Sequence, residues 1–175
     1  PSAWYHIVFS VDTTQATTAN RVKIYVNGVQ QTSTTAYFLG YLALNVNTFV
    51  NFTNSHTLGS NPSYNVSTYF DGYLTEVNLV DGQALTASDF GDTNSDTGVW
   101  QPKEYTGTYG TNGFYLKGRG TDNSGNGNNW TENNFNTTNS ALNTYDIMTD
   151  VPTLTDEDTS NYATFNPLDA SISAG

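Results

Sequence analysis

Two stretches near the N-terminus alternate apolar and polar residues with a period of two. In residues 4–11 (WYHIVFSV) alternate positions fall on two sides: Tyr5, Ile7, Phe9 and Val11 on one, Trp4, His6, Val8 and Ser10 on the other. Residues 21–27 (RVKIYVN) repeat the pattern. Such alternation is typical of half-buried antiparallel strands. Asn27-Gly28 predicts a tight turn after the second strand, because both residues tolerate positive φ.

Further elements follow along the first half of the chain. Residues 36–44 are strongly apolar around Gly40, which favours a bulge or bend over a helix. Residues 46–53 are a candidate strand, and residues 54–68 are dense in turn residues and predict a loop.

Residues 69–80 predict another strand, with a core side that alternates with a second side. The core candidates are Tyr73, Thr75, Val77 and Leu79. Asp81-Gly82 predicts a turn, and Thr86 with Asp89 predicts a capping box. Gly91 should end the helix that begins there, which limits it to about one turn.

The composition changes after residue 92. Residues 120–144 are nearly all Gly, Asn, Thr and Ser, and residues 145–169 are acidic with isolated apolar residues. We therefore divide the chain near residue 98, into a sandwich portion (1–98) and an Asn/Thr/Gly-rich extension or the start of a further β module (99–175). The low apolar density of the extension predicts packing along a neighbouring domain or subunit, because ordering each residue costs roughly 1–2 kcal/mol.

Charge and composition exclude several classes of protein. The net charge is −11 with only five Lys and Arg residues, which disfavours nucleic-acid binding. No apolar run is long enough to suggest membrane insertion. Cysteine is absent, so disulfides cannot stabilise the fold. An acidic, polar surface is better suited to binding a divalent cation, or to keeping a large assembly soluble, than to binding nucleic acid.

The order of the motifs carries a resemblance. W-Y-H-I-V-F-S-V-D, R-V-K-I-Y-V-N-G and F-D-G-Y-L-T-E-V-N-L-V-D-G occur in succession, and residues 3–91 resemble the C-terminal half of a laminin-G-like, concanavalin A-like jelly roll. The tail strings W-Q-P-K, D-N-S-G-N-G-N-N-W and Y-D-I-M-T-D-V-P-T are similar to virion-fibre proteins of marine and cyanobacterial bacteriophages. The resemblance implies an all-β, antiparallel jelly-roll sandwich. We expect it to be incomplete at the N-terminus and to carry an extended β/loop C-terminal tail.

Catalytic residues are not expected. The acids in and directly after the strand predicted over residues 69–80 are Asp71, Glu76 and Asp81, and steps of five residues place neighbouring acids on opposite faces. A paired acid and nucleophile about 5–9 Å apart is therefore not encoded there. His6 lies on the less apolar side of its strand and is expected to be structural.

One loop is a candidate calcium site. Asp122, Ser124 and Asn126 stand at positions one, three and five of a D-x-[DNS]-x-[DN]-G pattern, with Glu132 near the expected twelfth position. Calcium is thus a candidate cofactor, and a polar Gly/Asn turn is the alternative.

Glycan binding is the third candidate function, after catalysis and calcium binding. A sugar site pairs an aromatic ring with amide and carboxylate groups, and the loop containing His56, Asn61, Tyr64 and Asn65 has these residue types. The surroundings of Asn129-Trp130, or Trp4, Tyr25 and Asn27 on an exposed sheet face, are alternative sets. Ordinary packing of these aromatics is the simplest alternative.

These expectations predict a non-enzymatic virion-surface or tail-fibre protein. Its lectin-like domain would attach to a host-surface glycan at the virion surface or another extracellular location. Homo-oligomers, a homotrimer among them, and other virion proteins are the expected partners. The alternatives are a cellular adhesin or filament subunit, a glycan-degrading enzyme of the concanavalin-like class, and a structural domain without a ligand.

Overall fold

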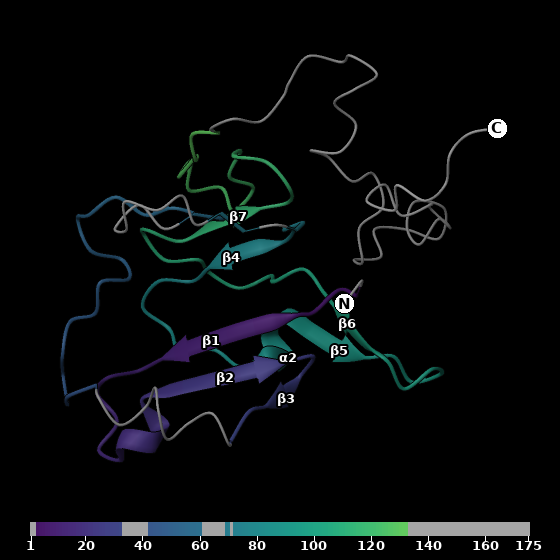
Figure 1. Ribbon diagram of the computed structural model, residues 1–175, viewed down its shortest axis with the longest axis horizontal. Coiled ribbons are helices and arrows are strands. Elements are labelled where there is room, and N and C mark those ends of the chain that lie inside the picture. Colours follow the sequence, from purple (N-terminus) through teal and green to yellow (C-terminus); the bar gives the residue numbers. More distant parts are fainter. Residues whose placement is uncertain (1–2, 33–41, 61–68, 71, 133–175) are drawn as a thin grey trace.

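The computed structural model describes residues 3–32, 42–60, 69–70 and 72–132 (Figure 1). Its strands are β1 (Ile7–Val11), β2 (Val22–Val26), β3 (Val29–Gln30), β4 (Val77–Leu79), β5 (Gly91–Thr93), β6 (Trp100–Pro102) and β7 (Phe114–Leu116). The helices are the 3-10 turn η1 (Thr18–Asn20) and α2 (Ala87–Phe90). All pairings between strands are antiparallel, so the predicted all-β class is confirmed. Within the described ranges, no helix has the length and apolarity to cross a bilayer.

The first three strands form one sheet in the order β1-β2-β3. Val8 lies opposite Tyr25, and Ser10 lies opposite Lys23. The predicted tight turn joins β2 to β3, with φ of 48° at Asn27 and 80° at Gly28. The two N-terminal strands and the turn between β2 and β3 are therefore confirmed. Burial alternates along β1, as predicted, but not along β2, where Val22 and Tyr25 lie on opposite faces and are both buried.

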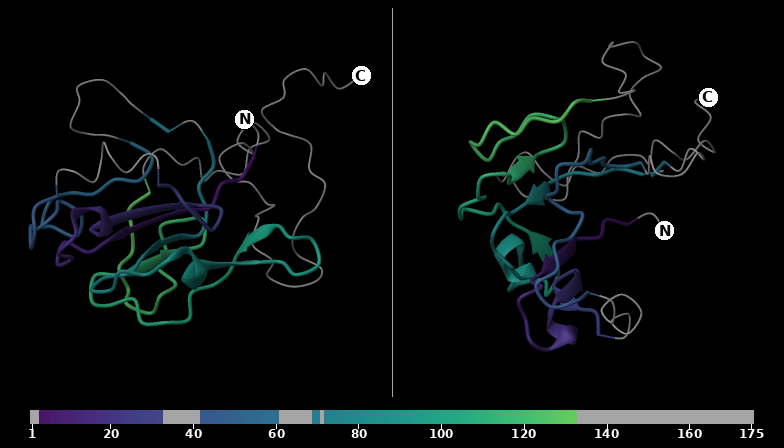
Figure 2. Two further views of the ribbon diagram at one scale, coloured as in Figure 1. Left: turned by 90° about the horizontal axis from the view of Figure 1, so that it is seen from below. Right: turned by 90° about the vertical axis from the view of Figure 1, so that its left-hand side faces the viewer.

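The face of this sheet that packs is the one that is less apolar in sequence. Val8 and Tyr25 are buried against Ala87, with Phe90 and Trp100 beside them. Figure 2 shows α2 and β5 on one side of the β1–β2 ribbon. Ile7 and Phe9 point to the opposite side and are exposed. The packed face is completed by residues from beyond position 86, which the alternation within β1 alone does not reveal.

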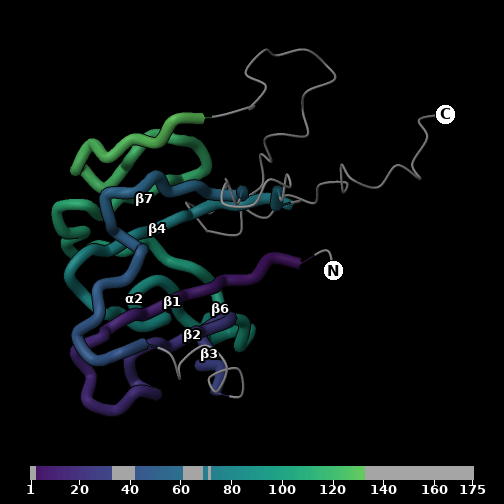
Figure 3. Tube along the Cα trace, turned by 60° about the vertical axis from the view of Figure 1, so that its left-hand side comes forward, coloured from purple at the N-terminus to yellow at the C-terminus, as the bar shows by residue number. Residues whose placement is uncertain are grey.

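Two smaller sheets, β4-β7 and β5-β6, accompany the first. Figure 3 places β4 and β7 beyond β1, on the side away from β3. Aromatic rings connect the helix to β7, in the order Phe90, Tyr105, Tyr109 and Tyr115, with neighbouring ring centroids 5.1, 5.1 and 6.3 Å apart. These sheets join strands from both sides of residue 98. The domain boundary predicted there stays a prediction, but the described part of the extension continues sheets that begin before it.

Two strand predictions need correction. The strand predicted over residues 46–53 is wrong, because the described stretch 42–60 contains no strand. Its backbone turns through left-handed conformations at Asn45 (φ 57°) and Asn51 (φ 63°). The strand predicted over residues 69–80 is limited to Val77–Leu79, and Glu76, at φ 55°, interrupts the extended backbone.

The remaining predictions around the helix hold. Gly82 adopts φ 80° in the predicted turn, the capping box of Thr86 and Asp89 is present, and α2 ends before Gly91. Residues 36–41, with Gly40, and residues 61–68 lie outside the described residues. The jelly-roll order of strands and the N-terminal incompleteness stay predictions.

Candidate functional site

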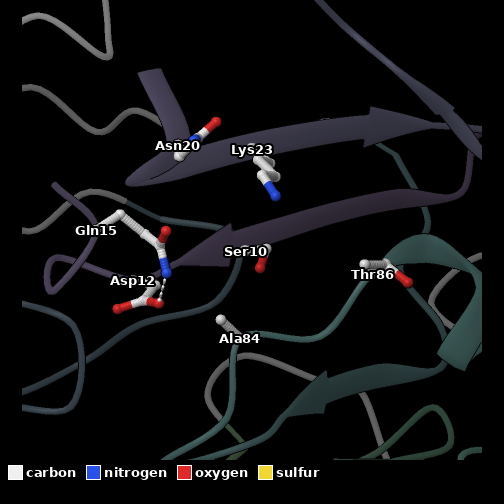
Figure 4. Close-up of a pocket in the computed structure, with 7 residues that line it drawn as sticks. All are labelled: Ser10, Asp12, Gln15, Asn20, Lys23, Ala84 and Thr86. Carbon is white, nitrogen blue, oxygen red and sulfur yellow. Dashed lines mark hydrogen bonds between the residues drawn. The ribbon is translucent and has the colours of Figure 1, made fainter. Parts of the chain in front are cut away.

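A polar hollow of about 180 Å³ lies beside the packed face of the first sheet. Its lining comes from β1, β2, the loop between them and the chain that leads into α2 (Figure 4): Ser10, Asp12, Gln15, Asn20, Lys23, Ala84 and Thr86. Ser10 and Lys23 form a cross-strand pair, two positions beyond the buried pair of Val8 and Tyr25. The hollow therefore begins where the apolar core of this face ends.

The loop that forms the rim is fixed by Arg21, which is buried. Its guanidinium donates to the backbone oxygens of Gln15 at 2.8 Å, Ala16 at 3.0 Å and Leu42 at 2.6 Å. A planar guanidinium with five N–H donors suits this task. The rim is thus held in place before any ligand arrives.

Asp12 organises the same loop from its other side. Its carboxylate accepts from the Thr14 N–H at 3.0 Å, the Thr14 hydroxyl at 2.6 Å and the Gln15 amide at 2.6 Å. The hydrogen bonds from the side chains of Thr14 and Gln15 are the largest causes that lower the pKa of Asp12. Asp12 is therefore ionised at neutral pH and largely occupied by its own loop.

Three other groups of the hollow have no such partners. In the described part of the chain, no hydrogen bond is formed by the Ser10 hydroxyl, the Asn20 side-chain amide or the Lys23 ammonium. In Figure 4 the Lys23 nitrogen and the Ser10 hydroxyl are directed toward the open space beside Ala84. Hydroxyl, amide and ammonium groups together can donate to and accept from a polyhydroxylated ligand.

This hollow was not predicted from the sequence. Its signal was a polar pair, Ser10 and Lys23, on strands whose other inward positions are Val8 and Tyr25. The pair becomes visible only when the register between the two strands is known, and period-two counting treats each strand separately.

The predicted glycan residues are only partly described. His56 is exposed, and its Nε2 lies 3.1 Å from the Phe49 oxygen; Asn61, Tyr64 and Asn65 lie outside the described residues. Tyr25 is buried, so its alternative place on an exposed sheet face is wrong. Asn27 instead accepts from the His6 N–H through Oδ1, at 2.8 Å.

The candidate calcium residues divide between two places. Asp122, Ser124 and Asn126 share one turn, where Asp122 accepts from the N–H groups of Tyr115, Ser124 and Asn128 at 2.8–2.9 Å. Burial acts to raise the pKa of Asp122, but these bonds together bring it down to about 2. Glu132 instead receives Arg119 in a bidentate pair, at 3.1 and 2.6 Å.

The residues of this turn therefore have partners of their own. No cluster of three His, Cys, Asp or Glu side chains suited to a metal occurs among the described residues. Calcium at this loop stays a prediction, and thermal melting with Ca²⁺ and with EDTA would test it.

The two described acids in and directly after the strand predicted over residues 69–80 also have hydrogen-bond partners. Tyr115 donates its hydroxyl to Glu76, and burial is the largest cause that raises the pKa of Glu76. Asp81 accepts from the Asn51 amide at 2.8 Å and from Asn112 at 3.2 Å. Asp71 lies outside the described residues. Glu76 and Asp81 thus each take part in the packing of separate segments.

His6 is tied to the core of the fold. Its Nδ1 accepts from the Trp100 indole N–H at 3.0 Å, and burial lowers the pKa of His6. The contact joins residues 94 positions apart in the chain. This geometry supports the structural role expected for His6.

Comparison with known proteins identifies the family. Residues 1–90 match the laminin-G model described as the concanavalin A-like lectin/glucanases superfamily, which is just over half of the 175 residues. The chain therefore belongs to this superfamily. No curated protein and no solved structure matches the chain. The resemblance of the tail to virion-fibre proteins stays a prediction.

Proposed function

We propose that this concanavalin A-like domain binds a glycan in the polar hollow and does not cleave it. The observation that carries the proposal is the convergence of Ser10, Asn20 and Lys23, which bring uncommitted hydrogen-bonding groups to one place. Sugar hydroxyls both donate and accept hydrogen bonds, so they match a lining of this kind. The superfamily contains lectins and glucanases, and the engagement of Glu76 and Asp81 in packing favours binding over hydrolysis.

The size of the hollow limits what it holds. Its volume of about 180 Å³ is below the roughly 300–1,000 Å³ of pockets that enclose a drug-sized ligand. We therefore expect one sugar unit of a longer glycan to enter, with the rest of the glycan crossing the surface. The loop with His56, Asn61, Tyr64 and Asn65 is a further candidate contact for such a glycan.

The biological setting we propose is a virion surface or tail fibre, with a host-surface glycan as the ligand. The support for this setting is the similarity of the tail sequence to virion-fibre proteins, together with the acidic, cysteine-free composition. A cellular adhesin built on the same domain is the alternative, and neighbouring genes for tail or secretion components would separate the two.

The test begins with a glycan array for the full chain and continues with titration of the best ligand. Lys23→Ala and Asn20→Ala change the hollow, and Lys103→Ala removes an exposed lysine elsewhere as a matched control. A hydrogen bond to a charged group contributes about 1.5–3 kcal/mol, so Lys23→Ala should weaken Kd by about 10-fold or more. Asn20→Ala should weaken it less, and Lys103→Ala should leave it unchanged.

Three results would contradict the proposal. An array without ligands would remove glycan binding, and unchanged affinity in both hollow variants would remove this site. Release of reducing sugar from a bound polysaccharide, lost in Glu76→Gln, would show that the protein is a hydrolase.

A further inference from the structure

The polar hollow contains a buried polar group that the described part of the fold leaves without a partner. Ser10 is only 9% exposed, and its hydroxyl forms no hydrogen bond with any described residue. In Figure 4 this hydroxyl is directed into the open space beside Ala84. Buried polar groups in folded proteins nearly always have a partner, so an exception calls for an explanation. A bound ligand would supply the partner that Ser10 lacks.

One cation of the chain is placed to meet the same ligand. All five Lys and Arg residues lie in the described ranges. Three of them are occupied: Arg21 by backbone oxygens, Arg119 by Glu132, and Lys117 by the ring of Tyr115. Lys103 is exposed and does not line the hollow. Lys23 lies opposite Ser10, and among the described residues no carboxylate is within ion-pair distance of its ammonium.

The acid that lines the hollow leaves this positive charge available. Asp12 accepts three hydrogen bonds from Thr14 and Gln15. Attraction to Lys23 is the smallest of the causes that lower the pKa of Asp12. Asp12 therefore remains an anion without a direct bond to Lys23, and it repels any second negative charge that enters the hollow.

An anionic group on a sugar matches this pair of side chains better than a neutral hydroxyl does. The ammonium of Lys23 offers only donors, and the hydroxyl of Ser10 can donate as well. The oxygens of an ionised carboxylate or sulfate only accept. Hydrogen bonds between an ammonium and such an oxygen are shorter and roughly twice as strong as bonds between neutral groups. An anion would thus satisfy Ser10 and compensate the charge of Lys23 together.

The charge of the whole chain limits which acidic glycan fits. With a net charge of −11, most of the surface repels a polyanion, although salt screens this repulsion beyond about 8 Å. A polymer with a charge on every unit is therefore disfavoured where it leaves the hollow. A glycan with an isolated acidic unit meets Lys23 and brings no further charge to the surrounding surface.

We propose that the hollow selects a sugar unit with one anionic group, a carboxylate or a sulfate ester, held by Lys23 and Ser10. This inference rests on the proposed function, because it names the class of glycan that the same hollow binds. The neutral remainder of the glycan would lie outside the hollow, across the surface.

The test is calorimetric titration of the full chain with methyl glycosides of glucose, galactose and mannose. Each sugar is used in four forms: neutral, uronate, uronate methyl ester and 6-sulfate. For at least one sugar, the uronate or the 6-sulfate should bind about 10-fold tighter than the neutral form. The methyl ester should bind no better than the neutral form, because it keeps the shape of the uronate without its charge. Whichever charged form binds more tightly identifies the anionic group.

Three variants assign the preference to the hollow. Lys23→Gln should abolish the preference for the charged form, Lys23→Arg should keep it, and Lys103→Gln removes the same charge elsewhere and should keep it too. Ser10→Ala should weaken binding of the charged form about 3- to 10-fold. It should not lower Tm, because the hydroxyl has no partner in the free chain.

The outcomes separate this inference from the proposed function. Equal affinity for neutral and charged forms, lost in Asn20→Ala, would leave a glycan site in the hollow and overturn the selection of an anion. A preference for charge that survives in Lys23→Gln would overturn it as well. Absence of binding by every sugar in the panel and by a glycan array would overturn both. A lower Tm with unchanged binding in Ser10→Ala would show that this hydroxyl serves the fold and overturn its role in the site.

Discussion

The turn at residues 122–129 offers a sharp test of how the C-terminal part of the described chain is held. The Asn126 amide donates to the oxygens of Gly110 at 2.6 Å and Gly113 at 2.9 Å. Asn126→Asp changes this N–H₂ group to oxygen, so a negative carboxylate faces two carbonyl oxygens. Both hydrogen bonds are lost, and an electrostatic repulsion replaces them.

The magnitude follows from the number of bonds lost. Each neutral hydrogen bond contributes about 0.5–1.5 kcal/mol, so the loss of two costs roughly 1–3 kcal/mol. The Gly113 oxygen keeps a second donor, the Asn128 amide at 2.9 Å, which favours the middle of that range. At about 2–4 °C per kcal/mol for a chain of this size, Asn126→Asp should lower Tm by about 4–8 °C.

Asn129→Asp is the matched control for a thermal melt followed by circular dichroism. It makes the same chemical change and adds the same charge, but Asn129 uses its oxygen to accept from the Asp122 N–H at 2.9 Å. A carboxylate keeps that acceptor, so the control should change stability by no more than about 0.5 kcal/mol. Equal melting temperatures of the two variants would refute the reasoning.

Three further predictions concern the rest of the fold. Burial lowers the pKa of His6 below 6.5. As the pH falls, the His6 imidazole is therefore protonated in the unfolded chain before it is protonated in the folded chain. The free energy of unfolding should fall as pH drops through 6.5 and level off below the folded pKa; urea titrations should lack this step in His6→Asn. Gly28 and Gly82 share φ 80°, but a Cβ at Gly28 would collide with the Trp100 ring, whereas one at Gly82 would meet no atom of the described residues within 4 Å. Gly28→Ala should therefore cost about 1–3 kcal/mol more than Gly82→Ala in chemical denaturation, and equal costs would contradict this packing. Burial raises the pKa of Glu76, so Glu76→Gln should be more stable than the wild type near pH 7, and this difference in stability should shrink as the pH falls toward 4.5. A variant less stable than the wild type at pH 7 would show that the hydrogen bond between Tyr115 and ionised Glu76 outweighs the cost of desolvation.

Local patterns in the sequence predict the local parts of this fold. Alternation within residues 4–11 and 21–27 gives β1 and β2, and the Asn27-Gly28 pair gives the turn, because each depends on neighbouring residues alone. The capping box at Thr86 and the end of the helix at Gly91 follow from the same kind of rule. The motif order over the first half also led to the correct superfamily.

The parts that sequence reasoning missed depend on contacts between distant residues. The packed face of β1 is decided by Ala87 and Trp100, not by its own hydrophobicity. Likewise, the hollow depends on the register that pairs Ser10 with Lys23. The failed strand at 46–53 has suitable residue types, but Asn51 adopts positive φ and its side chain bonds to Asp81.

Trp100 has a practical consequence for anyone who expresses this protein in pieces. The family match stops at residue 90, yet the indole at position 100 lies against Gly28 and Gly91 and bonds to His6. A fragment trimmed to the match would lose that indole and both partner strands, β6 and β7. Fragments for crystallisation or ligand screening should therefore extend through at least residue 132, because residues beyond the family match pair and bond with residues inside it.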